Sequence, residues 1–93
     1  MIRSFADKRT AAIFAGLGVK GLPPQIQQRA KAKLHSLDAA AAVDDLRNPP
    51  GNRLERLKGD RAGQYSIRVN DQWRICFVWR NSEAWDVEIV DYH

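Results

Sequence analysis

The side chains best suited to chemistry are two arginines on either side of a short turn and three polar residues at the end of the chain. They are Arg68, Arg74, Asp91, Tyr92 and His93. Guanidinium groups bind phosphate, and a phenol or an imidazole can donate or accept a proton. Cleavage of an RNA linkage by its own 2′-hydroxyl needs a proton acceptor, a proton donor and cations beside the pentavalent phosphorane. Brought together, these groups can supply all three without a metal.

The residues around the two arginines alternate in the way that β-strands require. In residues 64–70 and 73–80, every odd-numbered position is apolar. A slip of one residue would move each side chain to the other face, so the two apolar faces coincide only if odd positions pair with odd. A three-residue loop centred on Asp71 satisfies this condition, and a two-residue turn does not.

In this register Arg68 and Arg74 stand directly opposite each other on the polar face. Like charges so placed cost about 0.2–1 kcal/mol. Either both side chains point at a phosphate, or they turn to solvent and pair with neighbours such as Glu88. We favour the phosphate, because the preceding strand and turn carry four more cations: Arg53, Arg56, Lys58 and Arg61.

The last hairpin is expected to bring the chain end to the same site. A loop centred on Ser82 pairs Trp79 with Trp85 and joins the apolar faces of the two strands. Tyr92 then falls on the face of the arginines, and His93 follows it. A terminal segment of this kind is also often frayed surface, so both interpretations stay open at this point.

The first half of the chain predicts helices that cover this sheet. Residues 4–7 match a capping box, and a helix over residues 6–15 follows. Residues 23–24 are prolines, which suit the first turn of a second helix with a continuous apolar stripe. Residues 38–46 predict a short capped helix, and the breaker cluster of residues 48–52 ends the helical half.

These elements predict one α+β domain spanning residues 1–93. Its parts are an N-terminal strand over residues 2–5 and two helices packed on one face of a C-terminal antiparallel β-meander. Besides the two strands around Asp71, the sheet is expected to include a short strand over residues 54–57 and a final strand over residues 85–92.

Composition narrows the class of protein further. The single cysteine, Cys76, cannot form an internal disulfide, and with two histidines it cannot complete a structural zinc site. No cofactor is expected. No apolar run approaches the roughly 20 residues of a membrane span, and the N-terminus lacks the apolar core of a signal peptide. We therefore expect a cytoplasmic protein without membrane contact.

Charge is distributed unevenly along the chain. Residues 53–80 carry seven Lys or Arg and three acidic residues, whereas residues 81–93 carry four acidic residues and no Lys or Arg. The formal charge of +4 favours a polyanionic partner. Arg29, Lys31 and Lys33 lie mostly off the apolar stripe of the second helix, and we interpret them as a solvated helix face.

A long run of the second half resembles one family of toxins. The run PPGNRLERLKGDRAGQYSIRVNDQWRICF, residues 49–77, and the ending VEIVDYH are similar to the HigB group of host-inhibition toxins, within the RelE/ParE superfamily. The first half agrees mainly in layout. A chance match to a string this long is implausible.

The resemblance implies a small RelE-like toxin of a type II toxin–antitoxin system. Such a toxin pairs with a helix-turn-helix, HigA-like antitoxin, contacts operator DNA only through it, enters the A site of the 30S ribosomal subunit and cuts mRNA without a metal. Five residues match positions implicated in catalysis or transcript binding: Lys58, Arg74, Asp91, Tyr92 and His93. Arg68 matches the SIRV motif, and its phosphate contact follows from the pairing register.

The resemblance implies roles for these groups. Tyr92 or His93 would accept the 2′-hydroxyl proton, and Lys58 or His93 would assist the leaving oxygen. Arg74 and Arg68 would stabilise the phosphorane.

The sequence departs from the family pattern at one position. Some active relatives have a histidine in the strand before the Lys-Gly-Asp turn, where this chain has Glu55. Two other functions stay open. One is a non-enzymatic, ParE-like inhibitor of gyrase, and the other is a weakly active or inactive toxin that acts with its antitoxin as a co-repressor.

Overall fold

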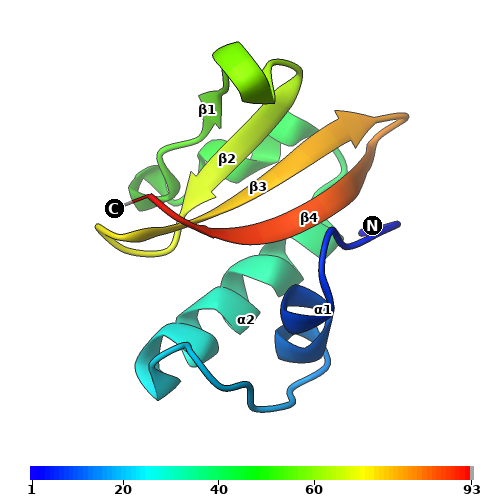
Figure 1. The fold of residues 1–93 in the computed structure, drawn as a ribbon. Coiled ribbons are helices and arrows are strands. Elements are labelled where there is room, and N and C mark those ends of the chain that lie inside the picture. Colours follow the sequence, from blue (N-terminus) through cyan, green and yellow to red (C-terminus); the bar gives the residue numbers. More distant parts are fainter. Residues whose placement is uncertain (93) are drawn as a thin grey trace.

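The second half of the chain folds into a four-stranded antiparallel sheet. The computed structural model describes residues 1–92. The strands lie in the order β1-β2-β3-β4, and each pairs with its neighbour in sequence (Figure 1). Their bounds are β1 Glu55–Arg56, β2 Gln64–Arg68, β3 Trp73–Arg80 and β4 Glu83–Asp91. The predicted meander is confirmed, although β1 is shorter than expected.

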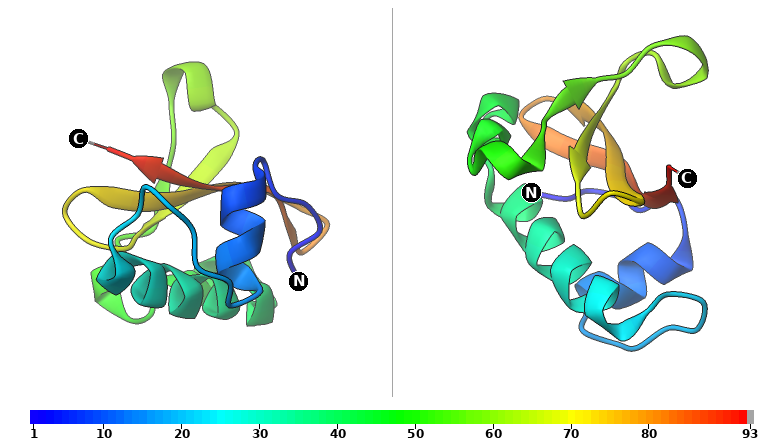
Figure 2. Two further views of the ribbon diagram at one scale, coloured as in Figure 1. Left: turned by 60° about the horizontal axis from the view of Figure 1, so that its bottom comes forward. Right: turned by 90° about the vertical axis from the view of Figure 1, so that its left-hand side faces the viewer.

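Two helices cover one face of this sheet (Figures 1 and 2). They are α1, Lys8–Phe14, and α2, Pro24–Ala39, and the remaining helical segments are single 3₁₀ turns: η1 Val43–Arg47, η2 Pro50–Asn52 and η3 Gly59–Arg61. The second helix begins at the predicted proline. None of the helices within residues 1–92 has the length and apolar character needed to cross a membrane. The predicted α+β architecture is thus confirmed.

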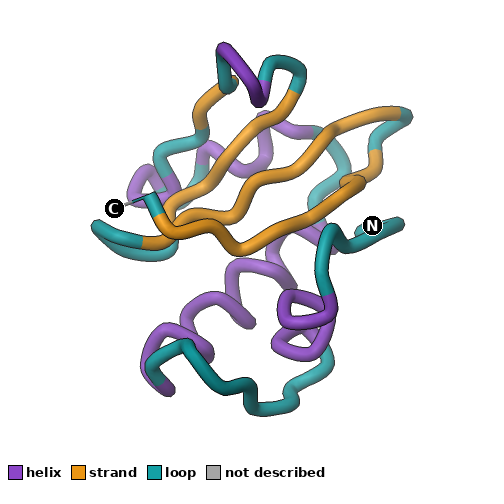
Figure 3. The backbone as a smooth tube through the Cα atoms, in the orientation of Figure 1, coloured by secondary structure: helices purple, strands orange, loops and turns teal. Residues whose placement is uncertain are grey.

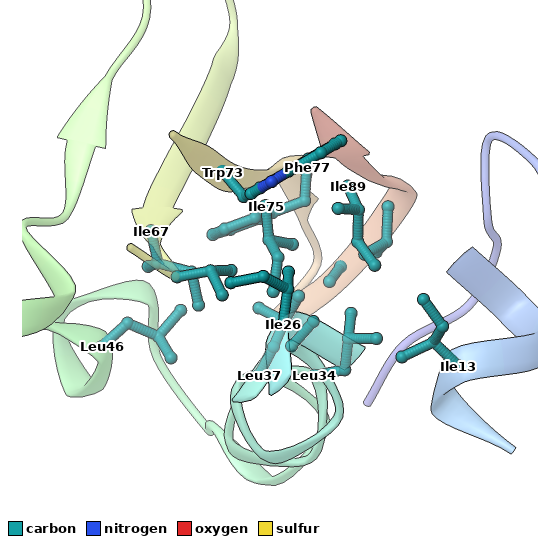
Figure 4. Packing of buried hydrophobic residues seen from close by; sticks show 14 of the residues in the cluster. Ile13, Ile26, Leu34, Leu37, Leu46, Ile67, Trp73, Ile75, Phe77 and Ile89 are labelled. Atoms are coloured by element: carbon teal, nitrogen blue, oxygen red, sulfur yellow. The ribbon is translucent and has the colours of Figure 1, made fainter. Parts of the chain in front are cut away.

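The apolar stripe of α2 packs against the apolar face of β2, β3 and β4. Leu34 and Leu37 are fully buried beneath Ile75 and Phe77 of β3, and Ile13 of α1 closes the side of the core (Figure 4). Burying an aliphatic or aromatic side chain of this size contributes about 1.5–3 kcal/mol. This packing commits the other face of the sheet to the polar residues.

The expected strand at the N-terminus is not a regular strand. Residues 1–6 run parallel to β4 but form only two isolated bridges, Ile2 with Ala84 and Phe5 with Val87, and they are drawn as loop in Figure 3. Asp86, between the two bridges, has a φ of 52°. A left-handed residue at this point breaks the ladder on β4, so continuous pairing is not possible.

The two expected helix caps are also different in the structure. Asp7, not Ser4, caps α1 by accepting a hydrogen bond from the Thr10 backbone N–H at 2.7 Å. Ser4 instead accepts a hydrogen bond from the Asp86 backbone N–H at 2.8 Å, because the N-terminal segment lies against β4. Asp38 lies inside α2 and accepts from the backbone N–H of Ile2, so the following short helix starts only at Val43.

Strand pairing confirms the first predicted hairpin completely. Ile67 lies opposite Ile75, and Arg68 lies opposite Arg74. The backbone N–H of Val69 donates to the Trp73 carbonyl, which closes the three-residue loop around Asp71.

The second hairpin follows the predicted register only at its far end, where Ile75 pairs with Ile89. Near the turn, Val78 rather than Trp79 lies opposite Trp85, so the prediction for Trp85 is wrong. Asn81 and Ser82 form a two-residue turn with φ values of 55° and 62°, and the extra residue at the Asp86 bulge restores the register beyond it. Trp85 therefore lies on the outer face, between the guanidiniums of Arg80 and Arg3.

The turn geometry generates a stability prediction. Ser82→Gly should raise the free energy of unfolding by about 0.5–1 kcal/mol, because glycine adopts a positive φ without the cost that a side chain incurs. Ser82→Val should lower it. Urea denaturation of both variants checks this, and equal stability of the two would contradict the left-handed turn.

Candidate active site

A polar cleft of about 410 Å³ opens on the face of the sheet away from the helices. It lies where the end of β2, the start of β3, the loop between them and the chain end meet. Its lining residues are Arg53, Arg68, Asn70, Asp71, Arg74 and Tyr92. Three guanidiniums and one phenol therefore surround a space with one carboxylate.

Arg74 forms the floor of this cleft and is almost completely buried, with 7% of its surface exposed. Its Nε donates to Ser66 Oγ at 2.8 Å, and its Nη2 donates to the Arg53 carbonyl at 2.6 Å. Nη1 lies 3.7 Å from Glu55 Oε1 of β1. The guanidinium is thus held by three strands or turns and has a fixed position.

Arg53 reaches the cleft because its backbone is left-handed, with a φ of 44°. This conformation follows the η2 turn and directs the Arg53 carbonyl to Arg74. A left-handed backbone costs a residue with a side chain about 1–2 kcal/mol. The bond to a buried cation offsets part of that cost.

Arg68 lies opposite Arg74, but its side chain forms an ion pair with the exposed Asp71 of the loop. The hydrogen bond from Arg68, with its positive charge, lowers the pKa of Asp71. Glu88, the alternative partner considered for the two arginines, pairs instead with Arg61 at 3.3 Å. An exposed counter-ion on a loop is readily displaced by a stronger anion.

Tyr92 covers Arg74 from the solvent side. The Arg74 guanidinium carbon lies 5.6 Å from the centre of the phenol ring, and 43% of the Tyr92 surface is exposed. Partial burial raises the pKa of Tyr92, and the neighbouring Cys76 thiol raises it further. The phenol is therefore protonated at neutral pH, so it can donate a proton but is a poor base.

Asp91 lies on the other face of the sheet from this cleft. It pairs with Trp73, and its carboxylate accepts a hydrogen bond from Gln72 Nε2 at 3.2 Å. The Tyr92 backbone N–H donates to the Gln72 carbonyl at 2.7 Å and anchors the chain end beside the β2–β3 loop. The expectation for His93 lies outside the described residues.

The other predicted cations are spread over the sheet. Arg56 pairs with Tyr65, so it projects to the face opposite Glu55 and Arg74. Arg61 lies over the middle of the sheet, where it contacts Glu88. Lys58 is an exposed residue just before η3 and does not line the cleft. The structure therefore brings together Arg53, Arg68, Arg74 and Tyr92, and not the whole predicted set.

Two cations that sequence reasoning assigned to a solvated helix face lie near this cleft. Lys33 of α2 donates a hydrogen bond to Asn52, directly before Arg53. Partial burial lowers the pKa of Lys33, and the charges of Arg29 and Arg68 lower it further. Arg29 and Lys33 are four residues apart, and this spacing in the sequence indicates that they share one face of the helix.

Comparison with solved structures defines the class of fold. Two structures of the YoeB–YefM complex from Staphylococcus aureus match with a TM-score of 0.62 and 15% identity, covering 100% of this chain and 98% of the other. At this identity the likeness shows the fold alone. The chain thus has the α+β architecture of that toxin structure.

Sequence comparison shows the family. Residues 3–93 match the family described as RelE-like toxin of type II toxin–antitoxin system HigB, and the chain belongs to it. It is 37% identical to Endoribonuclease HigB of Proteus vulgaris over 93 residues, which is 100% of both chains. It is 52% identical to Toxin HigB-1 of Vibrio cholerae over 63 residues, 68% of this chain and 66% of that one.

The burial of Arg74 generates a prediction about stability. Arg74→Ala should lower the free energy of unfolding by about 1.5–3 kcal/mol, because Ser66 and the Arg53 carbonyl lose a charged hydrogen-bond donor. Arg68→Ala removes an ion pair with a fully solvated carboxylate and should cost less. Thermal and urea denaturation measure both, and equal losses would contradict the structural difference between the two arginines.

Proposed function

We propose that the protein is a ribosome-dependent endoribonuclease that cuts mRNA without a metal and thereby inhibits translation. The observation that carries the proposal is the cleft lined by the guanidiniums of Arg53, Arg68 and Arg74 together with the phenol of Tyr92. The name of the whole-length relative, Endoribonuclease HigB, supports the same reaction. A cleft of this charge favours a phosphodiester over a neutral substrate.

The reaction proposed is a transfer of the phosphodiester to the neighbouring 2′-hydroxyl. The 2′-oxygen loses its proton and bonds to phosphorus, while the bond to the 5′-oxygen breaks and that oxygen gains a proton. The products are a 2′,3′-cyclic phosphate and a 5′-hydroxyl. Arg68 and Arg53 stabilise the charge that develops on the phosphorane, in place of the ion pair with Asp71.

The proton-transfer roles follow from the environment of each group. Tyr92 is protonated at neutral pH and partly exposed to the cleft, so we assign it as the donor to the leaving oxygen. His93, the next residue, is proposed as the acceptor of the 2′-hydroxyl proton. Lys58 and Asp91 lie outside the cleft lining, and we propose that they contact the transcript or the ribosome instead.

The proposed partners are a HigA-like antitoxin and the ribosome. The solved neighbours are complexes of a toxin with its antitoxin, which supports a protein partner for this chain. The basic surplus of residues 53–80 supports contact with ribosomal and messenger RNA at the A site of the 30S subunit. We propose that operator DNA is bound only through the antitoxin and that the complex acts in the cytoplasm.

Primer extension on programmed ribosomes tests the proposed reaction. Arg68→Ala should lower the cleavage rate by about 10²-fold or more, as expected when a group that stabilises transition-state charge is removed. Arg3→Ala, which removes the same charge beside Glu83 at the opposite end of the sheet, is the matched control and should stay near the wild-type rate.

A 2′-deoxynucleotide before the cut should abolish cleavage if the 2′-hydroxyl is the nucleophile. A phosphorothioate at the cut should not gain cleavage from Mn²⁺. Intact transcripts together with inhibited supercoiling by gyrase would overturn the proposal in favour of the gyrase inhibitor.

A second proposal, a toxin with weak activity, is favoured by the ion pair between Glu55 and Arg74. The Glu55 carboxylate neutralises part of the positive charge on the cleft floor and repels phosphate. Glu55→Gln should therefore raise the cleavage rate several-fold, measured in the same ribosome assay. An unchanged or lower rate would contradict a restraining effect of this carboxylate.

A further inference from the structure

The basic lining of the cleft continues onto helix α2. Lys33 Nζ donates to the side-chain oxygen of Asn52, and the Asn52 amide donates to the Leu46 carbonyl at 3.1 Å. Asn52 is completely buried and directly precedes Arg53, which lines the cleft. A rigid, hydrogen-bonded segment thus places Lys33 next to the cleft wall.

Arg29 extends this surface by one helical turn. It lies four residues before Lys33, and like charges at this spacing destabilise a helix by about 0.2–0.5 kcal/mol. Within residues 1–92, neither side chain forms an ion pair with a carboxylate. The four-residue spacing places Arg29 on the same face of α2 as Lys33, and its charge contributes to lowering the pKa of both Lys33 and Asp71.

We propose that Arg29 and Lys33 form, with Arg53 and Arg68, a second phosphate subsite that holds the RNA backbone beside the linkage to be cut. The inference rests on the proposed endoribonuclease function and adds the path of the bound strand. Single-stranded RNA is typically held in a positively charged groove that follows its backbone. RNA is the occupant favoured here because the subsite is continuous with the cleft that receives the scissile phosphate.

The chain offers a close control for this assignment in Lys31. Two residues along a helix turn a side chain by about 200°, so Lys31 and Lys33 project to different sides of α2. Lys31 lies over the loop after α1, where its Nζ would come within 3.3 Å of a Cβ added at Gly16. It lines a separate pocket with Ile13 and Leu17. The two lysines therefore carry the same charge on the same helix, but of the two it is Lys33 that contacts Asn52, the residue directly before Arg53 of the cleft lining.

The experiment compares Lys33→Gln, Arg29→Gln, their double variant and Lys31→Gln. Each is assayed for cleavage on programmed ribosomes and for binding to ribosomes whose mRNA carries a 2′-deoxynucleotide at the cut site, over a series of KCl concentrations. The double variant should raise KM and Kd by about 10-fold while kcat stays within about twofold. For the double variant, the slope of log Kd against the logarithm of the salt concentration should fall by about 0.7 for each cation removed. Lys33→Arg should bind RNA more tightly than Lys33→Gln, and Lys31→Gln should have the KM and Kd of the wild type.

The outcomes separate the inference from the proposed function. If the wild type cuts mRNA but the double variant keeps its KM and salt slope, the subsite is wrong and the function stands. If the wild type does not cut but still binds with a slope that depends on Lys33, the function is wrong and the subsite stands. The subsite would be overturned if Lys31→Gln raised KM and Kd as much as the double variant does. It would also be overturned if the double variant lost antitoxin binding while its RNA binding stayed unchanged. Thermal denaturation of each variant identifies a folding defect. If the glutamine variants fail to fold, the Kd and salt slope of Lys33→Arg, which keeps the positive charge, test the subsite.

Discussion

The site depends on one buried cation. Arg74 bonds Ser66 of β2 through its side chain and Arg53 of the η2 turn through a backbone carbonyl, and it faces Glu55 of β1. A charge taken out of water is tolerated only when such partners surround it. These bonds hold the end of the sheet, the preceding turn and the short edge strand in one arrangement. The cleft is the space that this arrangement leaves open.

Arg74, on the floor of the cleft, and Arg68, at its rim, are held in different ways. Arg74 is held in place by hydrogen bonds to Ser66 and the Arg53 carbonyl and shapes the site, whereas Arg68 is held by the exposed carboxylate of Asp71 on a loop. A phosphodiester carries the same single charge as a carboxylate, but in this cleft it can contact more than one guanidinium and can therefore displace that partner at little cost. Tyr92 lies between the two environments, and its partial burial raises the pKa of the phenol. Rigid support and exchangeable contacts thus occur within one small pocket.

The helical layer makes this division possible. Packing of Leu34 and Leu37 against the sheet commits Ile75 and Phe77 to the core, so the intervening residues of β3 must face the other side (Figure 4). The same layer carries Lys33 to the Asn52–Arg53 segment at the edge of the cleft. The core therefore positions the site directly, although none of its apolar side chains lines the cleft.

The sequence by itself determined the face of each central strand, because the alternation of residues 64–80 permits a single register around Asp71. It therefore placed Arg68 opposite Arg74 correctly, and the long string shared with the HigB family identified the class of toxin. The same rule, that odd positions pair with odd positions, failed near Trp85. A left-handed turn at Asn81 and Ser82 with a bulge at Asp86 buries the apolar faces equally well.

Only the tertiary structure decided which charges meet. The ion pairs of Arg74 with Glu55 and of Arg61 with Glu88, and the place of Lys33 beside Asn52, depend on side chains from different elements. Periodicity assigns a residue to a face of its own helix or strand, but the distance between two elements is set by how they pack. The burial that holds Arg74 in place and raises the pKa of Tyr92 arises from the same packing, and so it belongs to the fold and not to any local pattern.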